Sequence, residues 1–272
     1  MIHRVARPWI WVCAAFAGSP VISLAQAVGD AASAPASSVR HTSSLAWYYS
    51  RGDYRELTPT RVRYLPFSHE VAINNWRFKT TVPWLEVDGP GNILVNLGSV
   101  GQPAYVRDSA AVSGRGDVLV SATYELPMWS QGAPFVDVGV EVKVPTAETS
   151  KGLGTGKVDV GAQLDLYQML GQTTTFVTLS YRYRRSSPYF EQLHNSWALS
   201  LGGSRAIHDT LQAGLIYDYR QAVSEFTEAT HELLPYVSWS PDARWSLMVY
   251  FSRGFSHDSP DRAIGTQLSL RW

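Results

Sequence analysis

Residues 136–144, VDVGVEVKV, alternate strictly between valine and a residue of another kind. Successive side chains of a β-strand point to opposite faces, so this segment should form a strand with one apolar and one mostly polar face. The polar face would carry Asp137, Glu141 and Lys143. The same alternation returns in segments of roughly ten residues, the length of a tilted membrane strand, while a helical period is almost absent. The pattern predicts an all-β protein.

About twelve such segments follow one another, and single-chain bacterial barrels have an even number of strands. They lie near residues 45–51, 60–67, 70–82, 116–126, 134–144, 157–168, 173–184, 195–206, 210–221, 230–239, 244–254 and 263–272.

The connections between the later segments alternate in length. Tight turns are expected at 170–172, 207–209 and 240–243, and longer links at 145–156, 185–194, 222–229 and 255–262. Membrane barrels have short turns at one end and long loops at the other, whereas a soluble sandwich has no reason to alternate strictly. The chain is therefore expected to form a transmembrane antiparallel up-and-down β-barrel.

Two segments stand apart from the repeated pattern. Residues 83–115 are long and rich in Gly and Pro, and we expect them to form an extracellular loop over the mouth of the barrel or into its lumen. The final ten residues alternate again and end in an aromatic residue. This ending resembles the signal by which bacterial assembly machinery recognises outer-membrane barrels, and its residues here would be Ile264, Leu268, Leu270 and Trp272.

The N-terminal 1–27 segment has the features of a cleaved signal peptide. A short basic start is followed by an apolar stretch and a small-residue cleavage site, Ala25-Gln26-Ala27. Residues 28–44 are rich in Ala and Ser and are expected to form a flexible periplasmic linker, with the outer-membrane barrel over 45–272. The only cysteine, Cys13, would leave with the signal peptide, so the mature protein should contain no disulfide.

Composition narrows the class of protein. Lys plus Arg and Asp plus Glu are both 23, so no global field favours nucleic acid as a partner. No later stretch supplies the eighteen or so uninterrupted apolar residues of a membrane-spanning helix, so a span would have to be made by strands. The 10 Trp and 14 Tyr suit the aromatic girdles of a membrane barrel.

The polar positions of the alternating segments carry many charged residues. In a barrel they would line the lumen, and the set comprises Asp117, Glu125, Glu141, Lys143, Asp159, Asp165, Arg182, Arg184, Asp218, Arg220, Glu232 and Arg271. Such residues either pair to keep the barrel closed or form a polar path. His208 and His231 lack spaced ligand partners, so neither a metal nor a cofactor is expected.

Two sequences are candidates for catalysis. A membrane-embedded lipid hydrolase needs a serine nucleophile beside a histidine, and His194-Asn195-Ser196 has that spacing, as does His257-Asp258-Ser259. The fuller His-x-Ser-Asn-Gly context of the outer-membrane phospholipase is absent. The glycine-rich residues 152–157 lack the spacing of a phosphate-binding loop. Loop polarity explains these features better, and we expect no enzyme.

Several local patterns together resemble a family of outer-membrane proteins associated with phenol meta-pathway degradation and described as transporters. The pieces are Asn75-Trp76-Arg77, Pro83-Trp84, Gly89-Pro90-Gly91-Asn92, Gly114-Arg115-Gly116-Asp117, Pro145-Thr146-Ala147-Glu148, Gly152-Leu153-Gly154-Thr155-Gly156, Asp159, Asp218-Tyr219-Arg220 and Leu268-Ser269-Leu270-Arg271-Trp272. The resemblance extends from about Leu45 onward. It implies a barrel and passage of small hydrophobic or aromatic molecules, and the family supplies no catalytic residues.

These observations together predict a monomeric outer-membrane channel or facilitator for small molecules. Its partners would be membrane lipid, the assembly machinery and a small solute. Two alternatives stay open at this point: a lipid hydrolase that uses Ser196 and His194, and a structural or adhesive barrel with a closed lumen.

Overall fold

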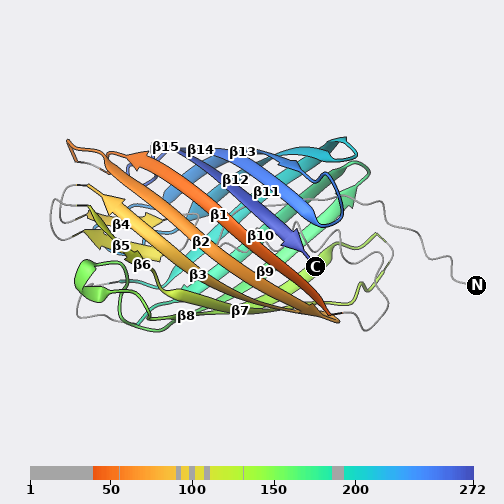
Figure 1. Cartoon of the computed structure of the whole chain (residues 1–272), viewed down its shortest axis with the longest axis horizontal. Helices are drawn as coiled ribbons and strands as arrows, with labels where there is room; N and C mark the ends of the chain where they lie inside the picture. Colours follow the sequence, from red (N-terminus) through yellow and green to blue (C-terminus); the bar gives the residue numbers. More distant parts are fainter. Residues whose placement is uncertain are drawn as a thin grey trace, which may run out of the picture.

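Figure 1 shows a computed structural model of the chain, which describes residues 39–272 apart from 55, 90–92, 98–101, 107–110, 131 and 186–192. Strands dominate these residues. They are β1 Arg40–Gly52, β2 Thr60–Ile73, β3 Trp76–Asp88, β4 Ile93–Leu97, β5 Gln102–Val106, β6 Val112–Arg115, β7 Val118–Glu125, β8 Phe135–Val144, β9 Asp159–Leu170, β10 Thr173–Tyr183, β11 Ser196–His208, β12 Leu211–Arg220, β13 Thr230–Trp239, β14 Trp245–Gly254 and β15 Arg262–Arg271.

Among the described residues, no helix is long and apolar enough to span a membrane.

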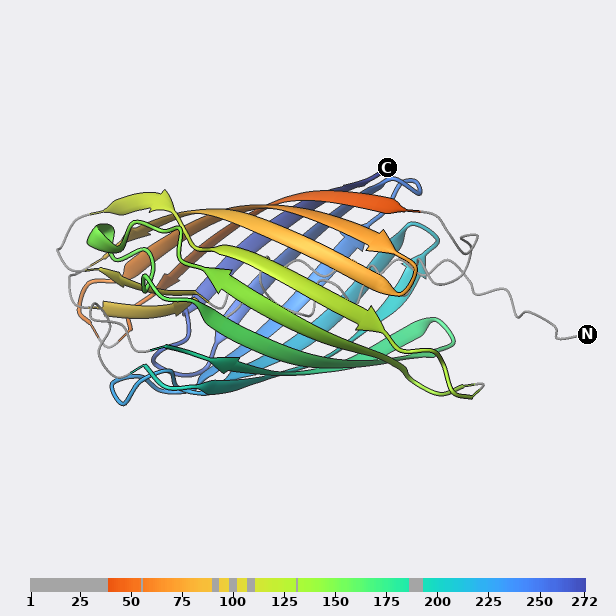
Figure 2. The same ribbon diagram turned by 90° about the horizontal axis from the view of Figure 1, so that it is seen from below.

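The strands form one closed antiparallel barrel (Figures 1 and 2). Thirteen strands share its sheet, in the order β2-β1-β15-β14-β13-β12-β11-β10-β9-β8-β7-β3-β6, and pairing of β2 with β3 closes the ring. Because β6 and β7 follow each other along the same partner, β3, they occupy one position, and the barrel wall has twelve positions. The predicted fold and strand number are confirmed.

The two ends of the barrel differ as the alternation of connections predicted. The short-turn end carries the turns 74–75, 171–172 and 209–210, together with 240–244 and the longer 126–134. The long-loop end carries 53–59, 89–111, 145–158, 184–195, 221–229 and 255–261. The C-terminus lies at the short-turn end (Figure 1).

Two boundaries near the start of the barrel differ from the prediction. β1 begins at Arg40, so the last residues of the expected 28–44 linker belong to the barrel. The turn between the second and third strands lies at Asn74 rather than between 67 and 70, because Ser68 pairs with Thr81 within the ladder. Asn74 has φ 54°, the left-handed conformation that a two-residue hairpin needs and that asparagine tolerates.

The expected 83–115 loop is shorter than predicted at both ends. β3 continues to Asp88 and β6 begins at Val112, so the loop spans 89–111. It contains the separate two-stranded hairpin of β4 and β5, which lies at the long-loop end and touches β3 (Figure 2). The expected signal peptide, 1–27, and the linker up to 38 lie outside the described residues.

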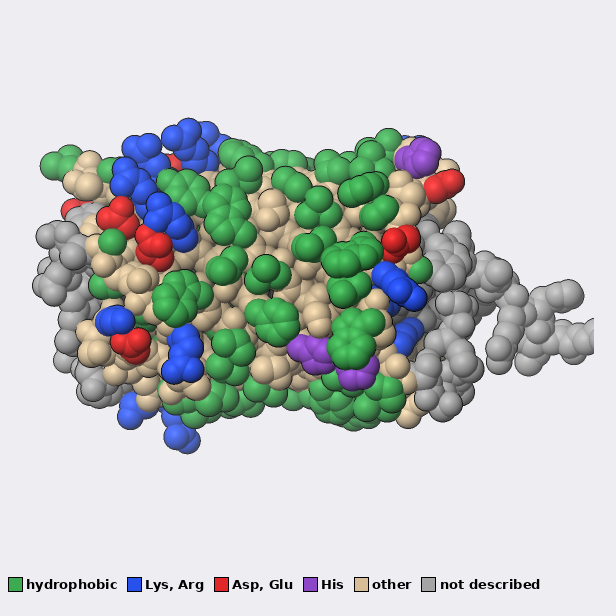
Figure 3. Space-filling model, viewed as in Figure 1, with side chains coloured by type: hydrophobic (Ala, Val, Ile, Leu, Met, Phe, Trp, Pro, Cys, Tyr) green, Lys and Arg blue, Asp and Glu red, His purple; other side chains and the backbone are tan. Residues whose placement is uncertain are grey.

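The outer face of the wall is apolar along the middle of the barrel (Figure 3). Along β8, Val138 and Val140 are 41% and 56% exposed, while Asp137 and Lys143 are buried. Exposed apolar side chains recur on the barrel strands, and Trp76, Trp84, Trp239, Trp245 and Trp272 are among them. A continuous apolar band with aromatic margins is the surface that a membrane barrel presents to lipid.

Candidate functional site: the inner face of the barrel

Two groups of inner-face side chains differ in chemistry, and the buried rings of Tyr167 on β9 and Phe176 on β10 lie among the charged group. We call the charged side chains Asp117, Glu141, Lys143, Asp159, Arg182 and Arg184 the ionic wall; they lie on or beside β7, β8, β9 and β10. We call Tyr48, Tyr54, Tyr64, Tyr236 and Tyr250 the aromatic wall; they lie on or beside β1, β2, β13 and β14. The order of strands around the barrel puts these two walls on nearly opposite sides.

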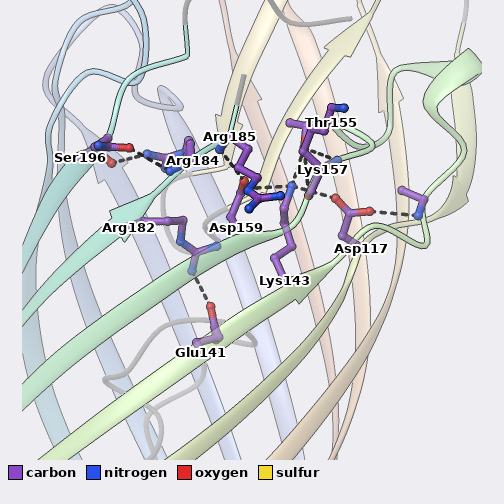
Figure 4. Close-up of polar contacts among 12 residues, drawn as sticks. Asp117, Glu141, Lys143, Thr155, Lys157, Asp159, Arg182, Arg184, Arg185 and Ser196 are labelled. Atoms are coloured by element: carbon purple, nitrogen blue, oxygen red, sulfur yellow. Dashed lines mark hydrogen bonds and ion pairs between the residues drawn. The ribbon is translucent and has the colours of Figure 1, made fainter. Parts of the chain in front are cut away.

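Lys143 is the centre of the ionic wall (Figure 4). Its Nζ lies 3.0 Å from Asp117 Oδ2 and 2.9 Å from Asp159 Oδ2, and it donates a hydrogen bond of 2.7 Å to Thr155 Oγ1. The three charged side chains are at most 2% exposed. A buried ammonium between two carboxylates satisfies charges that would each be costly alone.

This cluster also holds the 145–158 loop against the wall. The backbone N–H of Ala147 donates a 3.0 Å hydrogen bond to Asp117 Oδ1. Leu153, which is 1% exposed, packs into the hydrophobic cluster inside the barrel. The loop is therefore fixed at the mouth by both charge and apolar contact.

Arginines occupy the neighbouring strand of the ionic wall. Arg182 Nη2 lies 2.5 Å from Glu141 Oε1 on β8. Arg184 donates hydrogen bonds to Ser196 Oγ at 2.6 Å and to the carbonyl of His194 at 3.0 Å (Figure 4). These contacts place two guanidinium groups on the inner face near the long-loop end.

The aromatic wall is built differently. The ring of Tyr250 lies over Gly265, its partner across the strand pair, and a Cβ at Gly265 would overlap the ring. Tyr236 lies over Gly214 in the same way. A tyrosine seated over a glycine lies along the wall instead of projecting toward the barrel axis. Tyr54, in the loop after β1, is also buried, and burial raises the pKa of its phenol.

Several inner-face hydroxyl groups have no hydrogen-bond partner within the described part of the chain. Among the described residues, no hydrogen bond is made by the buried hydroxyls of Thr60, Tyr64, Thr174, Thr230, Ser238 and Ser240. Buried polar groups in native proteins are almost always satisfied by protein or by water. These positions are therefore suited to hydrogen bonding with water or with a solute.

All predicted lumen residues lie on the less exposed face of the wall. Asp117, Lys143, Asp159, Asp165, Arg184, Asp218 and Glu232 are buried, and Glu125, Glu141, Arg182, Arg220 and Arg271 are partly buried. The predicted lumen residues outside the ionic wall also form ion pairs or hydrogen bonds. Arg220 Nε lies 2.8 Å from Asp218 Oδ2, Ser252 donates to Glu232, and Thr178 and Gln163 donate to Asp165.

Sequence reasoning missed one buried ion pair. Arg77 Nη2 of β3 lies 2.5 Å from Asp137 Oδ2 of β8, with both side chains nearly inaccessible. The alternation Arg77-Lys79-Thr81 could have indicated that Arg77 lies on the inner face. It can be assigned to a face only when the preceding turn is placed at Asn74.

The two candidate hydrolytic pairs do not form catalytic arrangements. Ser196 Oγ accepts a hydrogen bond from Arg184, and among the described residues no contact joins it to the imidazole of His194. In the other pair, the Ser259 hydroxyl is hydrogen-bonded to the Ser256 hydroxyl and donates to the His231 carbonyl, while the His257 imidazole contacts the Glu228 carboxylate. A serine hydrolase needs its base within hydrogen-bond reach of the nucleophile.

The residues of the expected assembly signal lie on the outside of β15. Ile264, Leu268 and Trp272 are 42%, 44% and 64% exposed, and Leu270 is partly buried. The Trp272 ring stacks on His41 of β1 at a centroid distance of 4.7 Å. In the part of the chain that the structure describes, no group of three or more His, Cys, Asp or Glu side chains could hold a metal ion.

A closed twelve-position barrel with an apolar exterior and a charged, tyrosine-lined interior belongs to the class of outer-membrane β-barrels. Solved structures with this fold include an outer-membrane channel from Pseudomonas putida F1, which is 13% identical and has a TM-score of 0.65, covering 90% of this chain and 98% of that one. The NanC porin is 7% identical with a TM-score of 0.54, covering 84% and 98%.

Sequence comparison gives the family. Residues 56–272 match the model of the family described as "Putative MetA-pathway of phenol degradation", and the chain belongs to this family. The resemblance seen in the sequence motifs is thereby confirmed. No curated protein matches the sequence.

Proposed function

We propose that this protein is an outer-membrane channel for small molecules, and that its solutes pass between the aromatic wall and the ionic wall. The single observation that carries the proposal is the inner face itself, where tyrosines seated over glycines lie on strands opposite those that carry paired charges. A solute with one apolar and one polar side would find a matching surface on each wall.

The unpaired hydroxyl groups support a hydrated path. Thr60 and Tyr64 belong to β2 of the aromatic wall, and Thr174 belongs to β10 beside the ionic wall. If the interior were dry, each of these groups would lose a hydrogen bond at a cost of about 1–3 kcal/mol. Water along the path removes this penalty and would accompany the solute.

The solute class follows from chemistry and from the family. Aromatic rings pack against tyrosine faces, and hydroxyl or carboxylate groups suit the hydroxyl-lined and arginine-bearing surfaces. The family description refers to phenol degradation, which points to small aromatic molecules with a polar substituent. The twelve predicted lumen residues would then tune the passage of charge along this path.

We infer that residues 1–27 are removed as a signal peptide, that the long-loop end faces outward, and that the barrel acts as a monomer in lipid. Ile264, Leu268, Leu270 and Trp272 would present the signal to the assembly machinery. Their outward position on the last strand is compatible with such recognition.

Liposome swelling tests the proposal. Purified protein, folded into liposomes, is expected to admit small polar and aromatic solutes, with rates that fall as solute size rises. Liposomes that received the same amount of heat-unfolded protein provide the control. Equal swelling in both preparations for every solute would contradict a channel.

A further inference from the structure

A row of arginines crosses the outer face of the barrel at the long-loop end. Arg51 of β1 is the direct cross-strand partner of Arg61 on β2 and of Arg262 on β15. Arg253 of β14 continues this line, because the preceding residue, Ser252, pairs with Ala263. We call Arg61, Arg51, Arg262 and Arg253 the arginine row.

Three of the four arginines in the row have no ion-pair partner among the residues that the structure describes. Arg61 lies 3.1 Å from Asp88, but among the described residues no ion pair or hydrogen bond involves the side chains of Arg51, Arg253 and Arg262. Arg253 and Arg262 are exposed and Arg51 is partly exposed. Like charges placed directly across a strand pair destabilise a sheet. An arrangement of this kind is favourable only when anions lie against it.

The position of the row indicates which anion is available. The next outward residues toward the barrel centre are Tyr49, Ile264 and Phe251 on β1, β15 and β14, and the last two are 42% and 44% exposed. On β2 the corresponding residue is Arg63, which pairs with Glu86. The row therefore lies where the apolar band ends, and Figure 3 shows Lys and Arg side chains gathered at this margin. In a bilayer this is the level of the lipid headgroups.

We propose that the arginine row is a binding site for the phosphate groups of a phosphorylated glycolipid in the leaflet at the long-loop end. Guanidinium groups bind phosphate oxygens in bidentate fashion, which makes arginine better suited than lysine to such a site. Cross-strand neighbours are about 5 Å apart at Cβ, so adjacent arginines can share one phosphate. The inference rests on membrane placement and not on solute passage.

Native mass spectrometry of the full-length folded barrel in detergent can count bound lipid. The probes are bisphosphorylated lipid A and the same glycolipid without phosphates. The test variant is R51Q/R253Q/R262Q, and its affinity for the phosphorylated lipid should fall on the order of a hundredfold. The control R115Q/R205Q/R244Q removes as many exposed arginines elsewhere and should stay within about threefold of the wild type.

Each outcome decides the proposal. Equal binding by the wild type and the test variant, or equal binding of both glycolipids, would overturn it. Displacement of the lipid by inorganic phosphate at low millimolar concentration would assign the row to free phosphate instead. Gel mobility of folded barrel before and after heating shows whether the variants fold.

Liposome swelling should be unchanged in the test variant, so failure of this proposal is distinct from failure of the channel.

Discussion

The two inner walls of the barrel hold their side chains in place by different means. On the ionic wall, Lys143 is fixed by opposite charges at 3.0 and 2.9 Å. On the aromatic wall, Tyr250 is fixed by shape, because Gly265 leaves room for its ring. One arrangement depends on completing a set of charges, and the other depends on keeping a position free of side-chain atoms.

This difference predicts how each wall fails. Removing one member of a buried charge cluster leaves the others uncompensated, which is strongly destabilising. Filling a glycine position moves a ring away from the wall, which strains the barrel less but narrows the path. Substitutions in the ionic wall should therefore reduce stability more, and substitutions in the aromatic wall should reduce solute flux more.

The largest effect is expected for Lys143→Met. The substitution keeps much of the side-chain volume but leaves Asp117 and Asp159 buried without a cation, which should lower the free energy of unfolding by about 3–5 kcal/mol. Denaturant titration of the barrel in lipid vesicles, followed by tryptophan fluorescence, measures this loss.

Lys151→Met is the matched control for that prediction. Lys151 pairs with Glu148 in the same loop region, but both side chains are about half exposed, at 44% and 52%. Exposed pairs contribute at most about 1 kcal/mol. Similar losses for both variants would show that burial of the Lys143 cluster is not what stabilises the ionic wall.

A smaller effect is expected for Gly265→Ala on the aromatic wall. The new methyl group would overlap the Tyr250 ring, so the ring must turn toward the interior. We expect destabilisation of about 1–3 kcal/mol together with reduced solute flux. Gly161→Ala is the control. Its new Cβ would lie 3.6 Å from the nearest atom, the Tyr181 carbonyl oxygen, so stability and solute flux should hardly change. If the control lost as much flux, the seating of Tyr250 would not explain the result.

The smallest effect concerns ion preference. Arg182→Gln should favour cations and Glu141→Gln should favour anions, each by about twofold, because a unit charge about 8 Å away in water contributes about 0.5 kcal/mol. Reversal potentials in a salt gradient measure the preference. The double variant should return near the wild-type value. Shifts of the same sign in both single variants would contradict a position of this pair beside the path.

The sequence predicted the fold well where alternation is regular. β8 alternates valine with mostly polar residues, and β14 alternates large apolar residues with a mixed set, so both strands could be read directly. The turn at Asn74 was missed because Ser68 and His69 look like turn residues, while their pairing within the ladder depends on the neighbouring strand. Local composition does not contain that information.

The inner site was only partly predictable for a related reason. The charges of the ionic wall follow from alternation, but the pairing of Arg77 with Asp137 requires knowing that β3 and β8 lie on the same side of the barrel. Likewise, the seating of Tyr250 over Gly265 depends on strand register, which a single sequence does not determine. Alternation assigns a face to a residue, whereas register assigns its partner.

The most direct test of the account is the flux ratio of two solutes that differ only in aromaticity, 4-hydroxybenzoate and 4-hydroxycyclohexanecarboxylate, through barrels in liposomes. The wild type should pass the aromatic solute about two- to tenfold faster, because it can pack against the tyrosine faces. In the variant Y48L/Y64L/Y250L the ratio should fall close to one while total flux persists. An unchanged ratio in that variant, or no flux of either solute through the wild type, would contradict a path lined by the aromatic wall.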